Sequence, residues 1–420
     1  MTTVNITRRK FVIGAASTGV GLSMGMALPF GSALADDSTS TPEVNAWVVI
    51  DPDETVTIRI ARSEMGQGTL TGLAQLVAEE LECNWDNVTW EYPTPGENLK
   101  RDRVWQSFAT GGSRGIRGSH QYVREGGAAA RMMLIEAAAN EWGVPVAECH
   151  SVKGVVSHKP SGKTTTYGKV ASAAAKLAPP MEVTLKDPKD WALIGKPVKR
   201  LDTVDKLTGK QVFGADVKLP GMLNASIKAC PVHGGKRKSF DAAKAQKMPG
   251  VKSVIPVGDD AVAVIAETWW QAKTAMDAVD IEWDKGESVN VSSATIDKML
   301  QEGLSAETKF VANKVGDVQQ SFDGAAKTYT ADYSYPYQNH ATMEPMNATA
   351  VWTKDRCEVW VPTQNGEAAL ASAASAAELP AEQCEIYKLH LGGGFGRRGQ
   401  GDYVQQAVKI AKTMPGTPIK

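Results

Sequence analysis

The sequence predicts an α+β protein of mixed α/β character, built from more than one domain. Three observations support this fold class. Apolar residues recur at helical spacing in some segments, while in others they alternate with polar residues or form short runs bounded by turn residues. The chain has 420 residues, more than one hydrophobic core usually organises. A polar stretch marked by Pro179, Pro180 and Pro197 predicts a linker.

The expected strands and helices follow one another along the chain. Residues 47–50 and 55–60 flank an Asp-Pro-Asp turn, which predicts a hairpin. Further strands are expected at residues 87–92, 223–229, 251–257 and 261–266, within 325–361, and at 384–391. Helices are expected at residues 70–81, 121–142, 268–279, 286–312, 367–377 and 404–411. Short strands mixed with helices between residues 200 and 290 predict a compact α+β module.

The first 35 residues have the pattern of an export signal. Arg8 and Arg9 precede an apolar, glycine-rich run, and Ala33-Leu34-Ala35 provides a small-residue cleavage site. Glycines and Pro29 interrupt the apolar run, which argues against a membrane anchor. We therefore expect a twin-arginine signal peptide over residues 1–35 and a periplasmic protein whose cofactor is loaded before export. Any association with a membrane is expected to go through partner proteins.

Charge and cysteine content exclude several classes of function. The formal net charge of −1 argues against a nucleic-acid partner, since such proteins usually carry a basic excess. The cysteines are scattered without a CxxC pair, which argues against an iron–sulfur cluster, a zinc site or a c-type haem in this chain. We expect them to be buried small hydrophobic residues, with one loose pair able to oxidise after export. The histidines show no metal-ligand spacing and are expected to be structural or solvent-facing.

Three glycine loops stand in front of expected helices. The first loop is Glu64–Gly68, the second Thr110–Gly115 and the third Leu391–Gly399. Glycines let a backbone approach a ligand closely, and the N–H groups at the start of a helix attract anions. The candidate binding residues are Gly66, Gln67 and Gly68 in the first loop, Gly111, Gly112 and Ser113 in the second, and Gly393, Gly394, Phe395, Gly396 and Arg397 in the third. Ser113 can cap the following helix or bind a phosphate.

Taken singly, each loop also fits an ordinary turn, and two other functions stay open. Gly394, Gly396 and Gly399 match the GxGxxG fingerprint of a flavin or nicotinamide dinucleotide site. That fingerprint expects an acidic residue about twenty positions later, and none follows Asp402. The other alternative is a non-catalytic exported protein that binds a phosphate ligand in these loops.

Taken together, the loops resemble those of the xanthine oxidase family of molybdenum hydroxylases. Residues 65–68 resemble its MGQG loop, and residues 392–396 resemble its GGGFG loop, preceded by Thr363-Gln364. Residues 213–223, 231–235 and 248–251 resemble, in order, parts of its α/β hammerhead domain. MGQG comes before the hammerhead here and GGGFG after it. This permuted order is similar to the isoquinoline 1-oxidoreductase β-subunit group, which includes membrane-associated aldehyde dehydrogenases.

The resemblance implies a domain plan and an activity. A molybdopterin-binding segment would span residues 36–195, the hammerhead domain 196–295, and a truncated molybdopterin-binding domain 296–420. The enzyme would hydroxylate an N-heterocycle such as isoquinoline, or oxidise an aldehyde, with water as the oxygen source. The cofactor implied is molybdenum-molybdopterin in its cytosine dinucleotide form.

The resemblance also implies roles for the residues nearest the metal. Gln67 would hydrogen-bond an oxo ligand of molybdenum or the pterin, and Gly66 and Gly68 would let it approach. Phe395 and Gly396 would offer backbone N–H groups near the metal. No side chain is expected to ligate molybdenum, because the pterin dithiolene does so.

Further residues are implied for the rest of the cofactor and for the substrate. Gly111, Gly112 and Ser113 would hold the pterin or its nucleotide phosphates. Arg397 and Arg398 stand where some relatives place a substrate-contacting glutamate, which argues against a purine substrate.

Partners and a general base are implied outside this chain. With no iron–sulfur motif here, a small [2Fe–2S] protein would accept the electrons, and a cytochrome c is a candidate beyond it. The general base of the family is a glutamate in a GE motif, expected here beyond Lys420. The chain alone is therefore expected to be inactive.

Overall fold

The computed structural model describes residues 42–420 with the exception of residue 309. The described chain forms two compact units: residues 42–225 with 342–420, and residues 226–341. The predicted twin-arginine leader, residues 1–35, lies outside the described residues. Within the described part, no helix is both long and apolar enough to cross a membrane. The domain boundaries predicted at 195/196 and 295/296 stay predictions.

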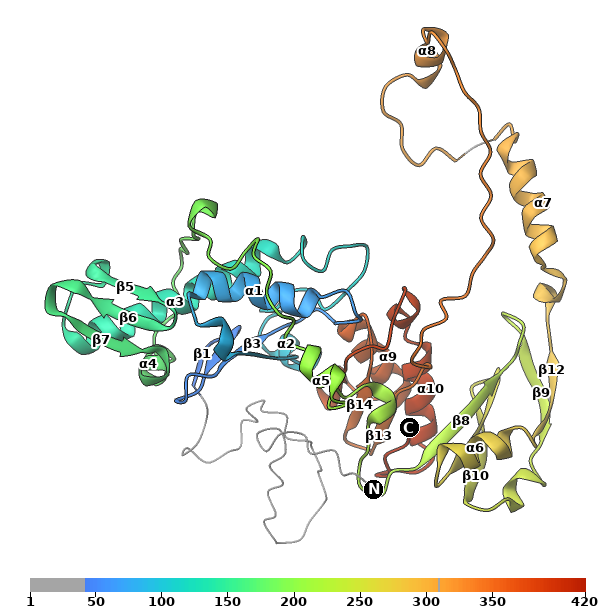
Figure 1. Ribbon diagram of the computed structural model, residues 1–420. Helices are drawn as coiled ribbons and strands as arrows, with labels where there is room; N and C mark the ends of the chain where they lie inside the picture. The colour runs from blue at the N-terminus through green and yellow to red at the C-terminus, as the bar shows by residue number, and fades with distance from the viewer. Residues whose placement is uncertain (1–41, 309) are drawn as a thin grey trace. The chain divides into compact units, whose positions relative to one another are not determined.

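A four-stranded sheet forms the N-terminal part of the first unit (Figure 1). Its strands, in spatial order, are β1 (Glu43–Asn45), β2 (Val48–Ile50), β3 (Val56–Arg59) and β4 (Val88–Glu91). The first three strands are antiparallel to one another, whereas β3 and β4 are parallel. Helix α1 (Thr69–Leu81) makes the crossover between β3 and β4, so the first loop lies between the carboxyl end of β3 and the start of α1.

Helix α1 packs against the long helix α3 (His120–Trp142) over this sheet. The apolar stripe of α1, which includes Leu70, Leu73 and Val77, is fully buried. A side chain at Gly127 of α3 would come within 2.4 Å of the backbone oxygen of Val77, so only glycine permits this approach. Gly127 therefore serves the packing of α3 on α1, whereas Gly126 makes room for the ring of Trp47.

Shorter elements complete the N-terminal part. An antiparallel meander follows α3 and consists of β5 (Cys149–Val152), β6 (Val155–His158) and β7 (Lys163–Thr166). The short helices are α2 (Pro95–Lys100), α4 (Tyr167–Ala174) and α5 (Thr203–Leu207). The predicted linker, residues 179–197, has no regular element beyond a 3₁₀ turn, yet it is fastened to α1. The buried carboxylate of Glu79 accepts backbone N–H groups from Ala192, Leu193 and Ile194.

A second sheet in the first unit carries the third loop. Its strands are β13 (Thr349–Trp352), β14 (Cys357–Val361) and β15 (Cys384–Lys388). β14 and β15 are parallel and are joined by helix α9 (Gly366–Ala377). The third loop follows β15 and leads into helix α10 (Asp402–Ala411), which packs with α9 around a separate hydrophobic cluster.

The second unit contains two small sheets and three helices. One sheet has the order β10 (Val251–Val257), β11 (Ala261–Ala266), β8 (Asn224–Ala229), and β12 (Asp280–Asp284) pairs with β9 (Lys236–Asp241) in the other. The helices are α6 (Trp269–Met276), α7 (Ser293–Leu304) and α8 (Val318–Asp323). Every residue of β11 is buried, and α6 packs against it to form the core of this unit.

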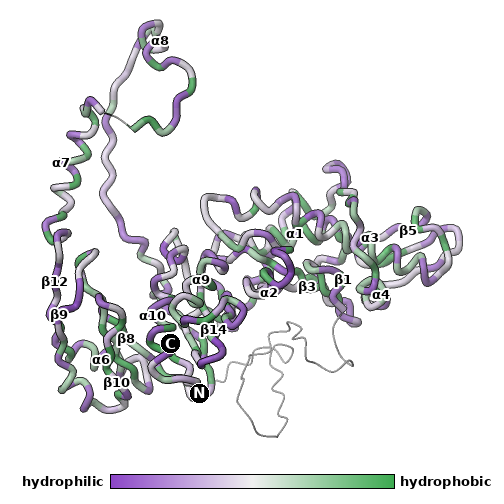
Figure 2. The backbone as a smooth tube through the Cα atoms, turned by 180° about the vertical axis from the view of Figure 1, so that it is seen from behind, coloured by the Kyte–Doolittle hydropathy of each residue, from purple (hydrophilic) through white to green (hydrophobic). Residues whose placement is uncertain are grey.

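The α+β class and most expected elements are confirmed, but two expectations are wrong in part. The helix expected at residues 286–312 is limited to α7 (Ser293–Leu304). The strands expected within residues 325–361 are found only at Thr349–Trp352 and Cys357–Val361, and residues 325–348 have neither strand nor helix. Figure 2 shows the tube leaving α8 without a helical coil. Tyrosines alternate with polar residues there, but a strand also needs a partner along its hydrogen-bonding edge. Tyr329, Tyr333 and Tyr335 instead lie 79–82% exposed. All five cysteines are free thiols, and four of them are buried as expected.

Candidate functional site

Three glycine loops that lie far apart in the sequence meet in the first unit. Ser63, just before the first loop, donates its backbone N–H to Thr110 Oγ1 of the second loop (2.9 Å). Leu391 of the third loop donates its N–H to the backbone oxygen of Glu64 (3.1 Å), and Thr110 donates its own to that of Gln364 (2.7 Å). Because the first loop, Gln364 and the third loop follow the carboxyl ends of β3, β14 and β15, they lie where open α/β sheets usually bind ligands.

The side chain of Gln364 ties the second loop to the third. Its Nε2 donates to the backbone oxygen of Thr110 (2.9 Å), and its Oε1 accepts the backbone N–H of Gly396 (2.9 Å). A Cβ at Gly394 would lie 2.7 Å from Gln364 Oε1 and 3.0 Å from the sulfur of Met65. Gly394 therefore marks the point where the third loop touches both the first loop and Gln364.

Glu64 shapes the first loop from inside. Its carboxylate is 1% exposed and accepts the backbone N–H groups of Gly66 (2.8 Å), Gly68 (3.0 Å) and Leu70 (3.0 Å). The prediction that this loop and the start of α1 offer free N–H groups to an external anion is wrong for these three groups. The anion that they bind is a side chain of the same loop.

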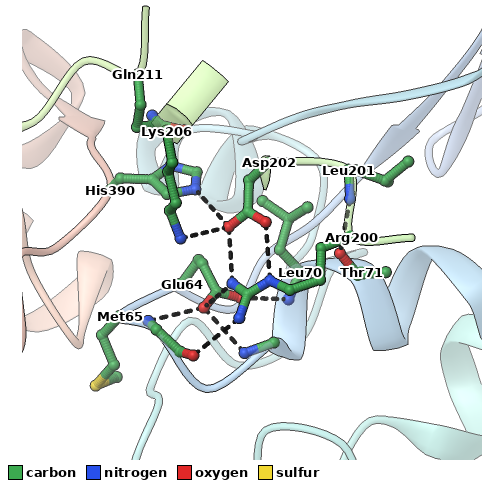
Figure 3. A network of polar contacts seen from close by, with 12 residues as sticks. Glu64, Met65, Leu70, Thr71, Arg200, Leu201, Asp202, Lys206, Gln211 and His390 are labelled. Carbon is green, nitrogen blue, oxygen red and sulfur yellow. Dashed lines mark hydrogen bonds and ion pairs between the residues drawn. The ribbon is translucent and has the colours of Figure 1, made fainter. Parts of the chain in front are cut away.

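Arg200 and Asp202 complete a polar network around that carboxylate (Figure 3). Arg200 contacts Glu64 Oε1 through Nη2 (3.1 Å) and donates from Nη1 to the backbone oxygen of Gly66 (3.0 Å). Asp202 accepts from Arg200 Nε and Nη2 at 2.9 and 2.8 Å, and from Lys206 Nζ at 2.6 Å. The segment that carries Arg200 and Asp202 therefore holds the first loop by both a charge and a backbone contact.

Asp202 and His390 join this network to the third loop. Burial acts to raise the pKa of Asp202, but its contacts with His390, Arg200 and Lys206 outweigh burial and hold that pKa well below the ordinary range. Nε2 of His390 lies 3.7 Å from Asp202 Oδ2, and its ring lies 4.9 Å from that of Trp90. Burial lowers the pKa of His390, which favours a neutral imidazole at pH 7. His390 is thus a buried structural histidine.

Gln67 is exposed, but its amide is folded back onto its own loop. Oε1 accepts the backbone N–H of Met65 (2.7 Å), and Nε2 donates to the backbone oxygen of Ser63 (3.0 Å). One of the two amide N–H bonds is thereby used. The hydrogen bond predicted from Gln67 to a ligand stays a prediction. It would use the second amide N–H, or the side chain would have to rotate away from Ser63.

The second loop differs from the first because its backbone donors are open. Among the described residues, no acceptor contacts the backbone N–H groups of Gly111, Gly112 or Ser113. A Cβ at Gly111 would meet no atom within 4 Å, so the loop faces open space there. Arg114 and Arg117 are exposed beside these donors. Backbone donors flanked by guanidinium groups suit a phosphate.

The prediction that Ser113 caps the following helix is wrong. Helix α3 begins seven residues later, at His120, with Ser119 at the N-cap position, and Ser119 makes no capping hydrogen bond. Its hydroxyl is used by Arg62 and Tyr122 instead. Ser113 has a φ of 55°, so it belongs to a turn inside the loop.

Glu344 holds the third loop much as Glu64 holds the first. Its Oε2 accepts the backbone N–H of Gly392 (2.9 Å) and lies 3.1 Å from Arg398 Nη2. Arg398 is fully buried and also donates from Nε to the backbone oxygen of Gly393 (2.9 Å). In each of the two loops, a buried carboxylate thus accepts the N–H of at least one glycine and contacts an arginine.

The outer face of the third loop carries Phe395 and Arg397. Phe395 is 71% exposed and has a φ of 51°. Arg397 forms a two-point ion pair with Asp402 at 2.8 and 2.6 Å, which occupies the guanidinium. The backbone N–H of Gly396 is donated to Gln364, so it is not open in this conformation.

Sequence reasoning missed the side chains that support the loops. Glu64 was seen only as part of a loop, and Arg200, Asp202 and Glu344 were not singled out. One signal was available for Glu64, since an acidic residue two positions before a Gly-x-Gly turn can accept the N–H groups that the turn leaves free. The partners of these carboxylates lie far along the chain, and a single sequence carries no sign of them.

Comparisons with known proteins give consistent findings. Two family models, both described as a molybdopterin cofactor-binding domain, match residues 4–210 and 302–420. The chain is 30% identical to a membrane-bound aldehyde dehydrogenase [pyrroloquinoline-quinone] of Gluconacetobacter polyoxogenes, over 99% of this chain and 55% of that protein. It is 27% identical to the β-subunit of isoquinoline 1-oxidoreductase of Brevundimonas diminuta, over 99% and 59% of the two chains. It is 26% identical to one of the chains of a nicotinate dehydrogenase of Pseudomonas putida, over 95% and 34%. The chain therefore spans 34–59% of the length of these relatives.

Proposed function

The chain belongs to the xanthine oxidase family of molybdenum hydroxylases, and from this premise we propose that its three glycine loops together hold a molybdenum-molybdopterin cofactor. The observation that carries the proposal is the convergence of the loops, which hydrogen bonds at Ser63, Thr110 and Leu391 hold together. Ordinary turns need not contact one another, whereas these loops meet at the carboxyl ends of β3, β14 and β15.

The donor set of the loops fits such a group. A pterin dinucleotide carries phosphates, and the open N–H groups of residues 111–113 beside Arg114 and Arg117 suit them. A polar ring system needs close backbone approach, which Gly66 and Gly111 allow because a Cβ at either position would meet nothing within 4 Å. The cytosine dinucleotide form is part of the proposal.

The residues of this chain would bind and orient the cofactor. The second loop would take the phosphates, the exposed Gln67 would offer its remaining N–H to the metal end, and Phe395 would cover one side. When bound, the cofactor would accept electrons from a substrate carbon, which gains an oxygen atom from water. The protein's part is position and electrostatics.

The substrate class and partners extend the proposal to the whole protein. Relatives named as aldehyde dehydrogenase and isoquinoline 1-oxidoreductase support an aldehyde or an N-heterocycle as substrate. A small [2Fe–2S] partner protein would take up the electrons, and a cytochrome c would follow it. Export by the twin-arginine route to the periplasm is proposed from Arg8, Arg9 and the cleavage pattern at Ala33–Ala35.

The proposal is tested on the full-length protein purified with its co-purifying partners. We expect about one molybdenum per chain by elemental analysis, and cytidine monophosphate after acid hydrolysis of the bound pterin. Pyrroloquinoline quinone, a flavin or a nicotinamide as the redox group of an active, molybdenum-free preparation would overturn it. Export is tested separately by replacing Arg8 and Arg9 with lysine, which should keep the protein in the cytoplasm.

A charge inserted into the second loop tests the site itself. Gly111→Asp adds a carboxylate at an open position without a positive φ, so the fold should tolerate it while phosphates are repelled. Gly303→Asp adds the same charge at another open position, in α7 of the second unit. We expect Gly111→Asp alone to lose molybdenum. Equal molybdenum content in both variants would remove the second loop from the site.

A further inference from the structure

We infer that Glu64 is an internal anion that pre-forms the first glycine loop for its ligand, and that Arg200 and Asp202 are positioning residues that keep it there. The inference rests on the proposed function, because the ligand whose binding it serves is the proposed cofactor. It concerns how this chain prepares the loop and assigns Glu64 no contact with the cofactor.

The side chain of Glu64 organises several backbone groups at once. Glu64 accepts N–H groups from Gly66, Gly68 and Leu70, so its two oxygens fix both the loop and the first turn of α1. Gly66 and Gly68 have φ values of 109° and 84°, a backbone conformation that L-residues rarely adopt. A loop with this backbone needs strong internal contacts to keep one shape, and the carboxylate provides three.

Arg200 and Asp202 hold that carboxylate in place. Arg200 contacts both Glu64 Oε1 and the backbone oxygen of Gly66, so it holds the anion and the loop at once. Asp202 fixes Arg200 through two nitrogens, and Leu201 between them donates its N–H to Thr71 Oγ1 of α1 (3.1 Å). Residues 200–202 are thus anchored on α1 and close over the first loop, as the dashed contacts in Figure 3 show.

The network around Glu64 leaves the outer side of the first loop open. The inward N–H groups of the loop are consumed by Glu64, while the outer side of Gly66 meets no atom within 4 Å and Gln67 is exposed. The loop therefore has its final shape before a ligand arrives. Pre-formed sites bind more tightly because less conformational entropy is lost on binding. Glu64 would act on cofactor retention through the shape of the loop.

A purely structural role for Glu64 makes a different prediction, and Glu79 provides the matched control. Glu79 is also a buried glutamate that accepts three successive backbone N–H groups, those of Ala192, Leu193 and Ile194, and it pairs with a cation, Lys186 (2.6 Å). It fastens residues 192–194 rather than any of the glycine loops. Glu79→Gln therefore disturbs the fold in the same chemical way and leaves the loops alone.

The experiment compares Glu64→Gln, Arg200→Gln and Glu79→Gln in the full-length holoenzyme. Loss of molybdenum is followed over time during dialysis, and the thermal midpoint of each variant is recorded. We expect both glutamate variants to unfold at lower temperature. Only Glu64→Gln and Arg200→Gln should release molybdenum faster. The release rate should rise by about tenfold to a hundredfold, the range typical of residues that orient the groups contacting a metal. The double variant Glu64→Gln/Arg200→Gln should add little to Glu64→Gln alone, because the two residues act as one unit.

A second readout separates failure of this inference from failure of the proposed function. Backbone hydrogen exchange of residues 65–70 is measured in cofactor-free protein, where it should be faster in Glu64→Gln than in Glu79→Gln. If wild-type protein holds no molybdenum, the proposed function fails, and the exchange result alone decides the pre-forming role. If exchange in the loop is unchanged, or the loaded Glu64→Gln variant keeps molybdenum as the wild type does, the inference is overturned.

Discussion

The first and third glycine loops are held by the same kind of contact in different surroundings. In each, a buried carboxylate accepts at least one loop N–H group and pairs with an arginine. At the first loop that arginine is Arg200, whose side chain is 36% exposed and lies 136 residues after Glu64. At the third loop it is Arg398, whose side chain is 0% exposed and belongs to the loop itself. Both carboxylates are buried, but water can reach the arginine that holds the first loop and cannot reach the arginine that holds the third.

The two arginine–carboxylate contacts should therefore differ in how much the fold depends on them. Loss of a carboxylate costs less when water can solvate the arginine left behind, as it can Arg200. A buried arginine that loses its carboxylate cannot be solvated by water, and its charge stays uncompensated. The third loop should therefore tolerate change poorly, while the first loop can be altered with the fold intact.

The largest expected effect comes from breaking the buried pair. Glu344→Gln leaves Arg398 charged, buried and without its counter-ion, and should lower the free energy of unfolding by about 3–5 kcal/mol. Glu64→Gln leaves Arg200 able to reach water and should cost about 1–2 kcal/mol. Urea denaturation of the two variants side by side measures the difference.

Glu358→Gln is the control for this comparison. Glu358 is a buried carboxylate of β14 whose partner, Arg356, has a side chain that is 53% exposed. It should behave like Glu64→Gln, with a loss of about 1–2 kcal/mol. Equal losses in Glu344→Gln and Glu358→Gln would show that exposure of the arginine is not what separates the two loops.

A smaller effect is expected where the two loops touch. Gly394→Ala would place a Cβ 2.7 Å from Gln364 Oε1 and 3.0 Å from Met65 Sδ, an overpacking that costs about 1–3 kcal/mol. Gly111→Ala meets no atom within 4 Å and neither glycine has a positive φ, so the control isolates the contact from backbone strain. Thermal unfolding should distinguish the two variants. A normal midpoint for Gly394→Ala would mean that the loops can separate at this point.

The acid sensitivity of the first loop follows from Asp202. Its pKa in the folded protein lies below the unfolded value of about 3.9, so the unfolded state binds the proton more readily. The stability that this carboxylate provides is complete above the unfolded pKa and is lost as pH falls toward the folded pKa. Between about pH 5 and pH 3, the wild type should therefore lose stability faster than Asp202→Asn, and the two unfolding curves should converge. Parallel losses over this range would assign the acid sensitivity to other groups.

Much of the fold could be predicted from the sequence because local patterns decide it. Leu70, Leu73 and Val77 mark α1 without knowledge of any partner, and β10 and β11 appear at the expected residues. The tyrosines between residues 329 and 337 show the limit of such patterns. Their alternation satisfies the side-chain rule for a strand, but strand formation also depends on a neighbouring backbone.

The candidate site could be predicted only in part. The resemblance identified the three loops, and hydrogen bonds bring them together. Local reasoning on each loop failed where a distant residue intervenes: the N–H groups at the start of α1 go to Glu64, which Arg200 holds, and the N–H of Gly396 goes to Gln364. The Arg200–Glu64 contact joins residues 136 positions apart and the Gln364–Gly396 contact residues 32 apart, so no short window of sequence contains both partners of either contact.

The smallest expected effect comes from Arg397, the neighbour of Arg398. Its side chain is 30% exposed and pairs with Asp402 at the start of α10, so Arg397→Ala should cost less than about 1 kcal/mol. The same variant decides whether Arg397 contacts the cofactor, as the resemblance implies, or only holds Asp402. Unchanged molybdenum content would restrict it to the ion pair, whereas loss of molybdenum with a normal unfolding midpoint would make it a ligand. In the second case the outer face of the third loop binds the cofactor through a charge, while the inner face, through Arg398, serves only the fold.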